Sequence, residues 1–181
     1  MIEERKIESL EKVREERGLL ERIIGYIPGY RGYKEKELRR ESDRLVRMDV
    51  ANRLKAAKDL LRKKLANPAV LQKVSSDDMW MLDSLMSRLD RVIQRIDRAV
   101  AGYSGMFDAI KVREDKLDAA IQLDLSLIER ADSLKASAEA FAKTVPGEDE
   151  WKKYMESLVL KIEEMDNLID RRIEIFRGLT S

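Results

Sequence analysis

The feature that most constrains this chain is its shortage of residues that interrupt a helix. Among 181 residues there are three prolines and eight glycines, and most of them fall in a few short stretches. The intervening sequence is rich in Leu, Ile, Glu, Lys, Arg and Ala, with 39% charged and 44% hydrophobic residues. Such a composition is typical of long α-helices and coiled coils, and no segment carries a strand signal. We therefore predict an all-α fold.

The interruptions divide the chain into five predicted helices, which cover roughly residues 2–26, 34–66, 76–101, 105–143 and 148–177. Ser75 is a candidate N-cap for the third helix, because its hydroxyl is followed by carboxylates in the first turn. Glu148 begins the acidic first turn of the fifth helix. Asn67-Pro68 closes the second helix, after which residues 69–74 form a short helical piece or a plain connection. Because short connections join long helices, we expect residues 1–181 to form a single domain, an antiparallel bundle of four to five long helices.

Apolar residues that recur at helical spacing predict the buried face of each helix. In the second and third helices they are Leu38, Leu45, Met48, Leu54, Ala57, Leu61 and Leu65, then Leu82, Leu85, Leu89, Val92, Ile93, Ile96 and Val100. In the fourth and fifth they are Ile110, Leu117, Ile121, Leu125, Ile128, Leu134 and Phe141, then Trp151, Tyr154, Met155, Leu158, Ile162, Met165, Ile169, Ile173 and Phe176. These residues are the predicted core.

Two features leave alternatives open. Trp80, with three methionines around it, is either core or a soft contact patch, and the ease with which Met fills space favours core.

The first helix has a narrow apolar stripe of Leu10, Val13, Leu20 and Ile24. That stripe fits a solvated helix start or a coiled-coil contact with another chain, and the small number of heptads favours the solvated start.

One stretch, Ile27–Glu37, gathers turn residues, tyrosines and cations. A second interruption, Ala101–Phe107, should lie at the same end of the bundle, where the fifth helix also finishes, with the Pro146 turn at the opposite end. Since Tyr and Arg are enriched in interface hot spots, we predict a partner-binding corner. Its residues are Tyr30, Arg31, Tyr33, Lys34, Tyr103 and Phe107. The alternative is that the tyrosines only plug the bundle end.

The sequence Ile27-Pro28-Gly29-Tyr30-Arg31-Gly32-Tyr33-Lys34-Glu35-Lys36-Glu37 and the later Gly102–Val112 stretch carry a resemblance. They resemble two landmarks of an uncharacterised prokaryotic family of helical proteins. Between them the resemblance spans most of the chain. It implies a helical protein and no particular activity.

Charge is distributed unevenly along the chain. Residues 31–64 contain 13 Lys and Arg against 6 Asp and Glu, although the whole protein has a net charge of +1. This stretch could bind nucleic acid or another polyanion, with tyrosines stacking on bases. The other interpretation is that the basic helix pairs with acidic neighbours within the protein.

Several classes of chemistry find no support in the sequence. Cysteine and histidine are both absent, which removes thiolate chemistry, the commonest general base and the usual zinc ligand. There is no Walker motif, dinucleotide-binding turn, signal peptide or membrane-spanning apolar run. We therefore expect a cytoplasmic, non-enzymatic interaction or scaffold protein without a cofactor or small-molecule substrate. Its expected partner is a protein or a second copy of itself, and a carboxylate metal site in the core stays open.

Overall fold

The computed structural model describes residue 25 and residues 35–99 and 114–180. This part of the chain is nearly all helical and contains no strand. Its helices are α2 (Glu35–Leu65), α3 (Pro68–Leu71), α4 (Ser76–Asp97), α5 (Glu114–Phe141) and α6 (Asp149–Thr180). The all-α bundle is therefore confirmed. Of the first predicted helix only Gly25 is described, so that helix stays a prediction.

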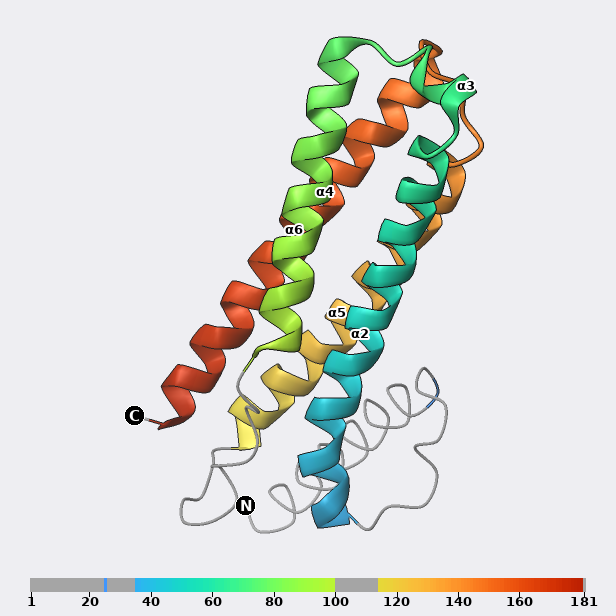
Figure 1. The fold of residues 1–181 in the computed structure, drawn as a ribbon. Helices are drawn as coiled ribbons and strands as arrows, with labels where there is room; N and C mark the ends of the chain where they lie inside the picture. The colour runs from blue at the N-terminus through green and yellow to red at the C-terminus, as the bar shows by residue number, and fades with distance from the viewer. Residues whose placement is uncertain (1–24, 26–34, 100–113, 181) are drawn as a thin grey trace, which may run out of the picture.

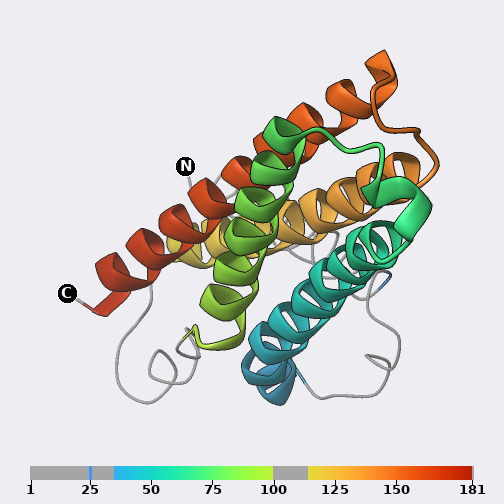
Figure 2. The same cartoon turned by 45° about the horizontal axis from the view of Figure 1, so that its top comes forward.

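The four long helices pack in the cyclic order α2, α4, α6, α5. The hairpins α2–α4 and α5–α6 are antiparallel, as predicted, whereas α4 runs parallel to α6 and α2 runs parallel to α5 (Figures 1 and 2). Helices that follow one another in the chain are therefore antiparallel as predicted, and the two parallel interfaces, α4 with α6 and α2 with α5, join helices that are not consecutive. Because 16 residues separate α4 from α5 in the sequence, these consecutive helices can occupy diagonal corners of the bundle.

The predicted placement of the helix ends is confirmed. Helix α2 begins, α4 ends, α5 begins and α6 ends toward one end of the bundle, and the α5–α6 connection lies at the other (Figure 1). That connection contains Gly147, whose φ of +88° is in the left-handed region that residues with a side chain rarely adopt.

The short connection after α2 and the start of α4 follow the expected local chemistry. Asn67 caps α3 by accepting a 3.0 Å hydrogen bond from the Ala69 N–H, and Pro68 is the first helical residue, so the short helical piece is confirmed. Ser75 caps α4 by accepting a 3.1 Å hydrogen bond from the Asp78 N–H. Each cap satisfies a donor that the first turn of a helix leaves without a partner.

The core is made by the predicted stripes, with a few exceptions. Leu82 to Ile96 on α4, Leu125 to Phe141 on α5 and Trp151 to Ile169 on α6 bury their predicted apolar residues, except that Tyr154 is only partly buried. Met48 was predicted to be buried but is 47% exposed, because Val46 and Val50 on either side of it face the core. Ile173 is also wrong, at 36% exposed. Small residues that sequence spacing overlooked, Ala51, Ala131 and Ala138, are buried between the helices.

One buried ion pair joins α5 to α6. Arg172 Nε donates a 2.8 Å hydrogen bond to Asp124 Oδ1, and the exposed fractions of the two side chains are only 6% and 3%. A buried ion pair must recover a large desolvation cost, so it is weak evidence for stability. It does disfavour any register of α5 against α6 that would leave either charge without a partner.

A second buried polar contact ties α4 to α6 near the other end of the bundle. The indole of Trp151 is fully buried, lies 4.4 Å from the ring of Phe141 between centroids, and donates a 3.1 Å hydrogen bond from Nε1 to Asp78 Oδ2. Asp78 thus belongs to the first turn of α4 and also accepts from a core side chain of α6. Its carboxylate satisfies a donor that would otherwise be buried without a partner.

We predict that Asp78→Ala lowers the free energy of unfolding by about 1–3 kcal/mol, because the buried Trp151 N–H loses its acceptor. Asp78→Asn keeps an acceptor oxygen and should cost less than half as much, mainly through the weaker interaction with the helix dipole. Urea denaturation monitored by circular dichroism measures both values. Equal losses in the two variants would contradict the assigned role of the hydrogen bond.

Candidate docking surface on helices α4 and α6

Large apolar side chains are exposed along the outer face of α4 and α6. Trp80 on α4 is 75% exposed and Leu160 on α6 is 60% exposed, the two highest values among the exposed large hydrophobic residues described. Both line one open groove of about 450 Å³. We call this groove the Trp80 surface, and its residues are Trp80, Met81, Ser84, Arg88, Glu156, Val159 and Leu160.

The exposure of Trp80 corrects the expectation that it is core. Trp80 precedes Leu82 by two residues, which places it about 200° around the helix from the buried stripe. The position one turn before Leu82 is taken by Asp78, which is buried and bonded to Trp151. The second interpretation of the sequence, a soft contact patch, is the one compatible with this geometry. Helical spacing measured from Leu82 would have been enough to assign Trp80 to the outer face.

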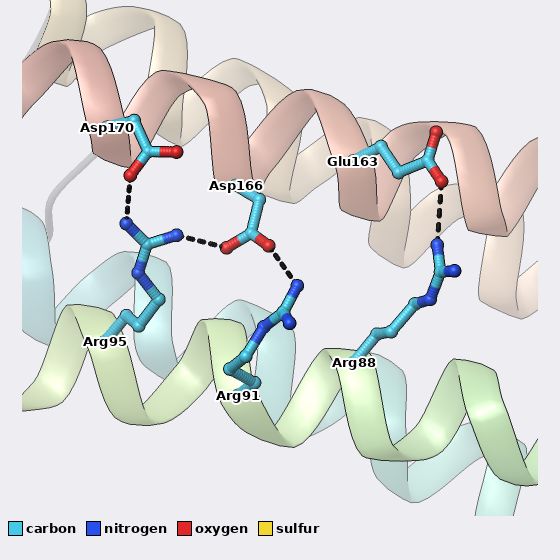
Figure 3. Close-up of polar contacts among 6 residues, drawn as sticks. All are labelled: Arg88, Arg91, Arg95, Glu163, Asp166 and Asp170. Atoms are coloured by element: carbon cyan, nitrogen blue, oxygen red, sulfur yellow. Dashed lines mark hydrogen bonds and ion pairs between the residues drawn. The ribbon is translucent and has the colours of Figure 1, made fainter.

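From Arg88 toward the C-terminal ends of the two helices, ion pairs connect α4 to α6 (Figure 3). Arg88 Nη1 lies 2.7 Å from Glu163 Oε1, and Arg91 Nη2 lies 2.5 Å from Asp166 Oδ2. Arg95 contacts both Asp166 and Asp170. We call these six residues the arginine ladder. Both sets are spaced by three and then four residues, so the pairs stay level along the two helices.

Within the arginine ladder, Arg95 is the arginine that pairs with two carboxylates. Burial disfavours its charged form, but hydrogen bonds to Asp170 and Asp166 outweigh that effect and raise the pKa of Arg95 above its ordinary value. Asp166 is the shared acceptor, since it receives both Arg91 and Arg95. A network around a half-buried carboxylate holds α4 beside α6 more firmly than isolated surface pairs would.

We predict that Asp166→Asn lowers the free energy of unfolding by about 1 kcal/mol at low ionic strength, because two guanidinium groups lose their shared charge partner. The loss should shrink in 1 M salt, where the Debye length falls to about 3 Å and the ion pairs are weakened. Glu164→Gln is the matched control, since among the described residues Glu164 pairs with an exposed Arg130 at 3.1 Å and both side chains are about half exposed. A salt-independent loss in Asp166→Asn would contradict an electrostatic role.

The residues of the predicted partner-binding corner lie outside the described part of the chain. Tyr30, Arg31, Tyr33 and Lys34 precede α2, and Tyr103 and Phe107 fall between α4 and α5. Their gathering at one end of the bundle stays a prediction. The Trp80 surface lies in the first halves of α4 and α6, toward the end of the bundle that holds the α5–α6 connection.

Most described cations of the basic 31–64 stretch have partners within the protein. Arg53 pairs with Asp49 and Asp132, while Lys55 and Lys58 pair with Asp97 and Asp90 on α4. Two others donate to backbone carbonyl oxygens, Arg47 to Ala99 at 2.8 Å and Lys64 to Thr144 at 2.6 Å. For these residues the intramolecular interpretation of the charge excess holds. Cations that already bind carboxylates and carbonyls are poorly placed to neutralise phosphates.

The remaining concave feature of note is polar. A groove of about 630 Å³ between α5 and α6 is lined by Ser126, Glu129, Arg130, Ser133, Glu164, Asn167, Leu168 and Arg171. Its charges are balanced, and Arg130 and Glu164 pair across it. Within residues 35–99 and 114–180 no cluster of three or more acidic side chains could hold a metal ion. No helix in the same ranges has the length and apolarity to cross a membrane.

Comparison of the chain with protein families, with curated proteins and with solved structures finds no match. The resemblance to a prokaryotic helical family therefore stays a prediction from the two sequence stretches. The class of protein defined by the fold is an all-α helical bundle.

Proposed function

We propose that this protein is a non-enzymatic interaction or scaffold module that docks a protein partner through the Trp80 surface. The observation that carries the proposal is the exposure of Trp80 and Leu160 on two adjacent rigid helices. Tryptophan is the residue most enriched in interface hot spots, and it exposes a large apolar area to water unless a partner covers it.

The setting of Trp80 supports a docking role. Met81 and Val159 line the groove, are partly buried and pack against the core. The exposed side chains of Trp80 and Leu160 therefore lie beside residues that are anchored in the core. Arg88 and Glu156 lie among the lining residues and supply polar groups around the apolar centre. An apolar centre with a polar rim is the usual anatomy of a protein–protein interface. The rigid helices also mean that little conformational entropy is lost on binding.

The alternative function class, polyanion binding, receives less support from the described residues. Polyanion binding is disfavoured by the pairing of the basic-stretch cations with carboxylates and carbonyls. The partner-binding corner, Tyr30, Arg31, Tyr33 and Lys34 with Tyr103 and Phe107, remains a second predicted contact region on the same module.

A photo-reactive amino acid in place of Leu160 tests the proposal in the native cell. Because Leu160 is exposed beside Trp80, we expect irradiation to yield a covalent adduct with protein, and adding Trp80→Glu should reduce its yield at least about 30-fold, as for a hot-spot residue. The matched control carries the same photo-reactive group at Met48, an exposed apolar position of α2 that does not line the groove.

The proposal fails if Leu160 and Met48 give the same adducts, or if Trp80→Glu leaves the Leu160 adduct unchanged. Loss of fold does not complicate this result, since Trp80 is 75% exposed and its replacement should change the free energy of unfolding by less than about 1 kcal/mol. Circular dichroism of each variant checks that expectation.

A further inference from the structure

The charges around the Trp80 surface form an alternating pattern. Toward the start of the two helices, α4 carries Asp77 while α6 carries Lys152 and Lys153, and all three are exposed. Three turns further on the signs are reversed, with Arg88 on α4 and Glu163 on α6. Asp77 precedes Arg88 by eleven residues and Lys152 precedes Glu163 by eleven, so each pair lies on one side of its helix.

This pattern is self-complementary. A two-fold axis parallel to the helices lays α4 of one copy over α6 of the other, because α4 and α6 themselves run parallel (Figure 1). Asp77 then faces the partner's Lys152 and Lys153, and Arg88 faces the partner's Glu163. Near the centre, the partner's Leu160 lies about 7.5 Å further along the axis than Trp80, because the axis preserves height and the ladder sets Arg88 level with Glu163. An interface between identical copies requires this property, since the same patch must complement itself.

The position of Glu156 selects this axis over the alternative. An axis running across the helices would also oppose unlike charges at the four corners. It would, however, bring Glu156 near the partner's Glu156, because this residue lies within about 2 Å, along the helix axis, of the midpoint between Lys152 and Glu163. Like charges that face each other across an interface are costly. With the axis along the helices, Glu156 instead meets the neutral Trp80 and Ser84 side of the partner.

We propose, building on the docking role of the Trp80 surface, that its partner is a second copy of this chain, related by a two-fold axis along the bundle. Helix α4, with 22 residues, is about 33 Å long, and two adjacent helices present a face about 20 Å wide. Extended over the whole of α4, the contact would cover at most about 600 Å² on each copy, which is at the lower limit for a specific interface. A reversible dimer that forms in the micromolar range is the expected result.

Sedimentation equilibrium of the full chain across the micromolar range tests the proposal. The wild type should show a monomer–dimer equilibrium, and Trp80→Glu should raise the dissociation constant at least about 30-fold. Met48→Glu adds the same charge at an exposed apolar position outside the surface and should leave the dissociation constant within about two-fold.

Charge reversal tests the axis. Lys152→Glu with Lys153→Glu places acid opposite Asp77 and should weaken the dimer about ten-fold. Adding Asp77→Lys restores opposite charges only when the axis is along the helices, so the triple variant should recover most of the affinity. A triple variant weaker than the double would overturn this arrangement, because across the helices each reversed charge would meet a like charge.

The outcomes separate the dimer from the docking role. A wild type that stays monomeric throughout, while the Leu160 photo-adduct in cells contains a different protein, overturns the dimer and leaves the docking surface standing. A monomeric wild type without any Trp80-dependent adduct overturns both. Unlabelled and ¹⁵N-labelled chains that carry the photo-reactive group at position 160 can also be mixed after purification and irradiated. Cross-linked pairs that contain one chain of each isotope would support the dimer.

Discussion

The structure depends on the burial of one apolar stripe from each of four long helices. Leu54, Leu89, Ile128 and Leu158 are fully buried and come from α2, α4, α5 and α6 respectively. A fully buried side chain of this size contributes about 1.5–3 kcal/mol relative to exposure, and each of the four helices buries several. Once each stripe faces inward, helical geometry fixes which residues face out. Trp80 is on the outer face for this reason, because the stripe of α4 cannot turn toward it without exposing the leucines.

Polar contacts then distinguish this arrangement from other ways of packing the same stripes. The Asp78–Trp151 hydrogen bond joins α4 to α6 near one end, the Arg172–Asp124 pair joins α5 to α6 elsewhere, and the arginine ladder keeps α4 level with α6. Apolar burial is nondirectional and tolerates sliding, whereas the two buried contacts, Asp78–Trp151 and Arg172–Asp124, are lost if the helices shift by a turn. The arginine ladder repeats every turn, so the same shift would leave one arginine without its carboxylate. The parallel α4–α6 pair, which creates the Trp80 surface, is the interface with most of these contacts. Docking and helix register are therefore linked through the same two helices.

Sequence reasoning predicted the helices well because their signals are local. Ser75 and Asn67 are caps whose chemistry is complete within three residues, and the stripe from Leu82 to Ile96 is a strict helical repeat. It did not predict that α4 and α6 lie side by side, since that depends on contacts 75 residues apart, such as Arg88 with Glu163. It also missed the burial of Asp124 and Arg172, because a charged pair has no periodic signature. The position of Trp80 could be predicted from the sequence, because an angle of about 200° from Leu82 places it on the outer face, whereas its methionine neighbours favour the core.

Hydroxyl-radical footprinting compares the only two tryptophans under identical exposure and tests the docking role of Trp80 most directly. Trp151 is fully buried and should be protected both in dilute purified protein and in the native cell. Trp80 should oxidise readily in dilute purified protein and should be protected in the cell, where its partner covers it. If Trp80 oxidises at the same rate relative to Trp151 in both settings, nothing covers this surface and the docking account is wrong.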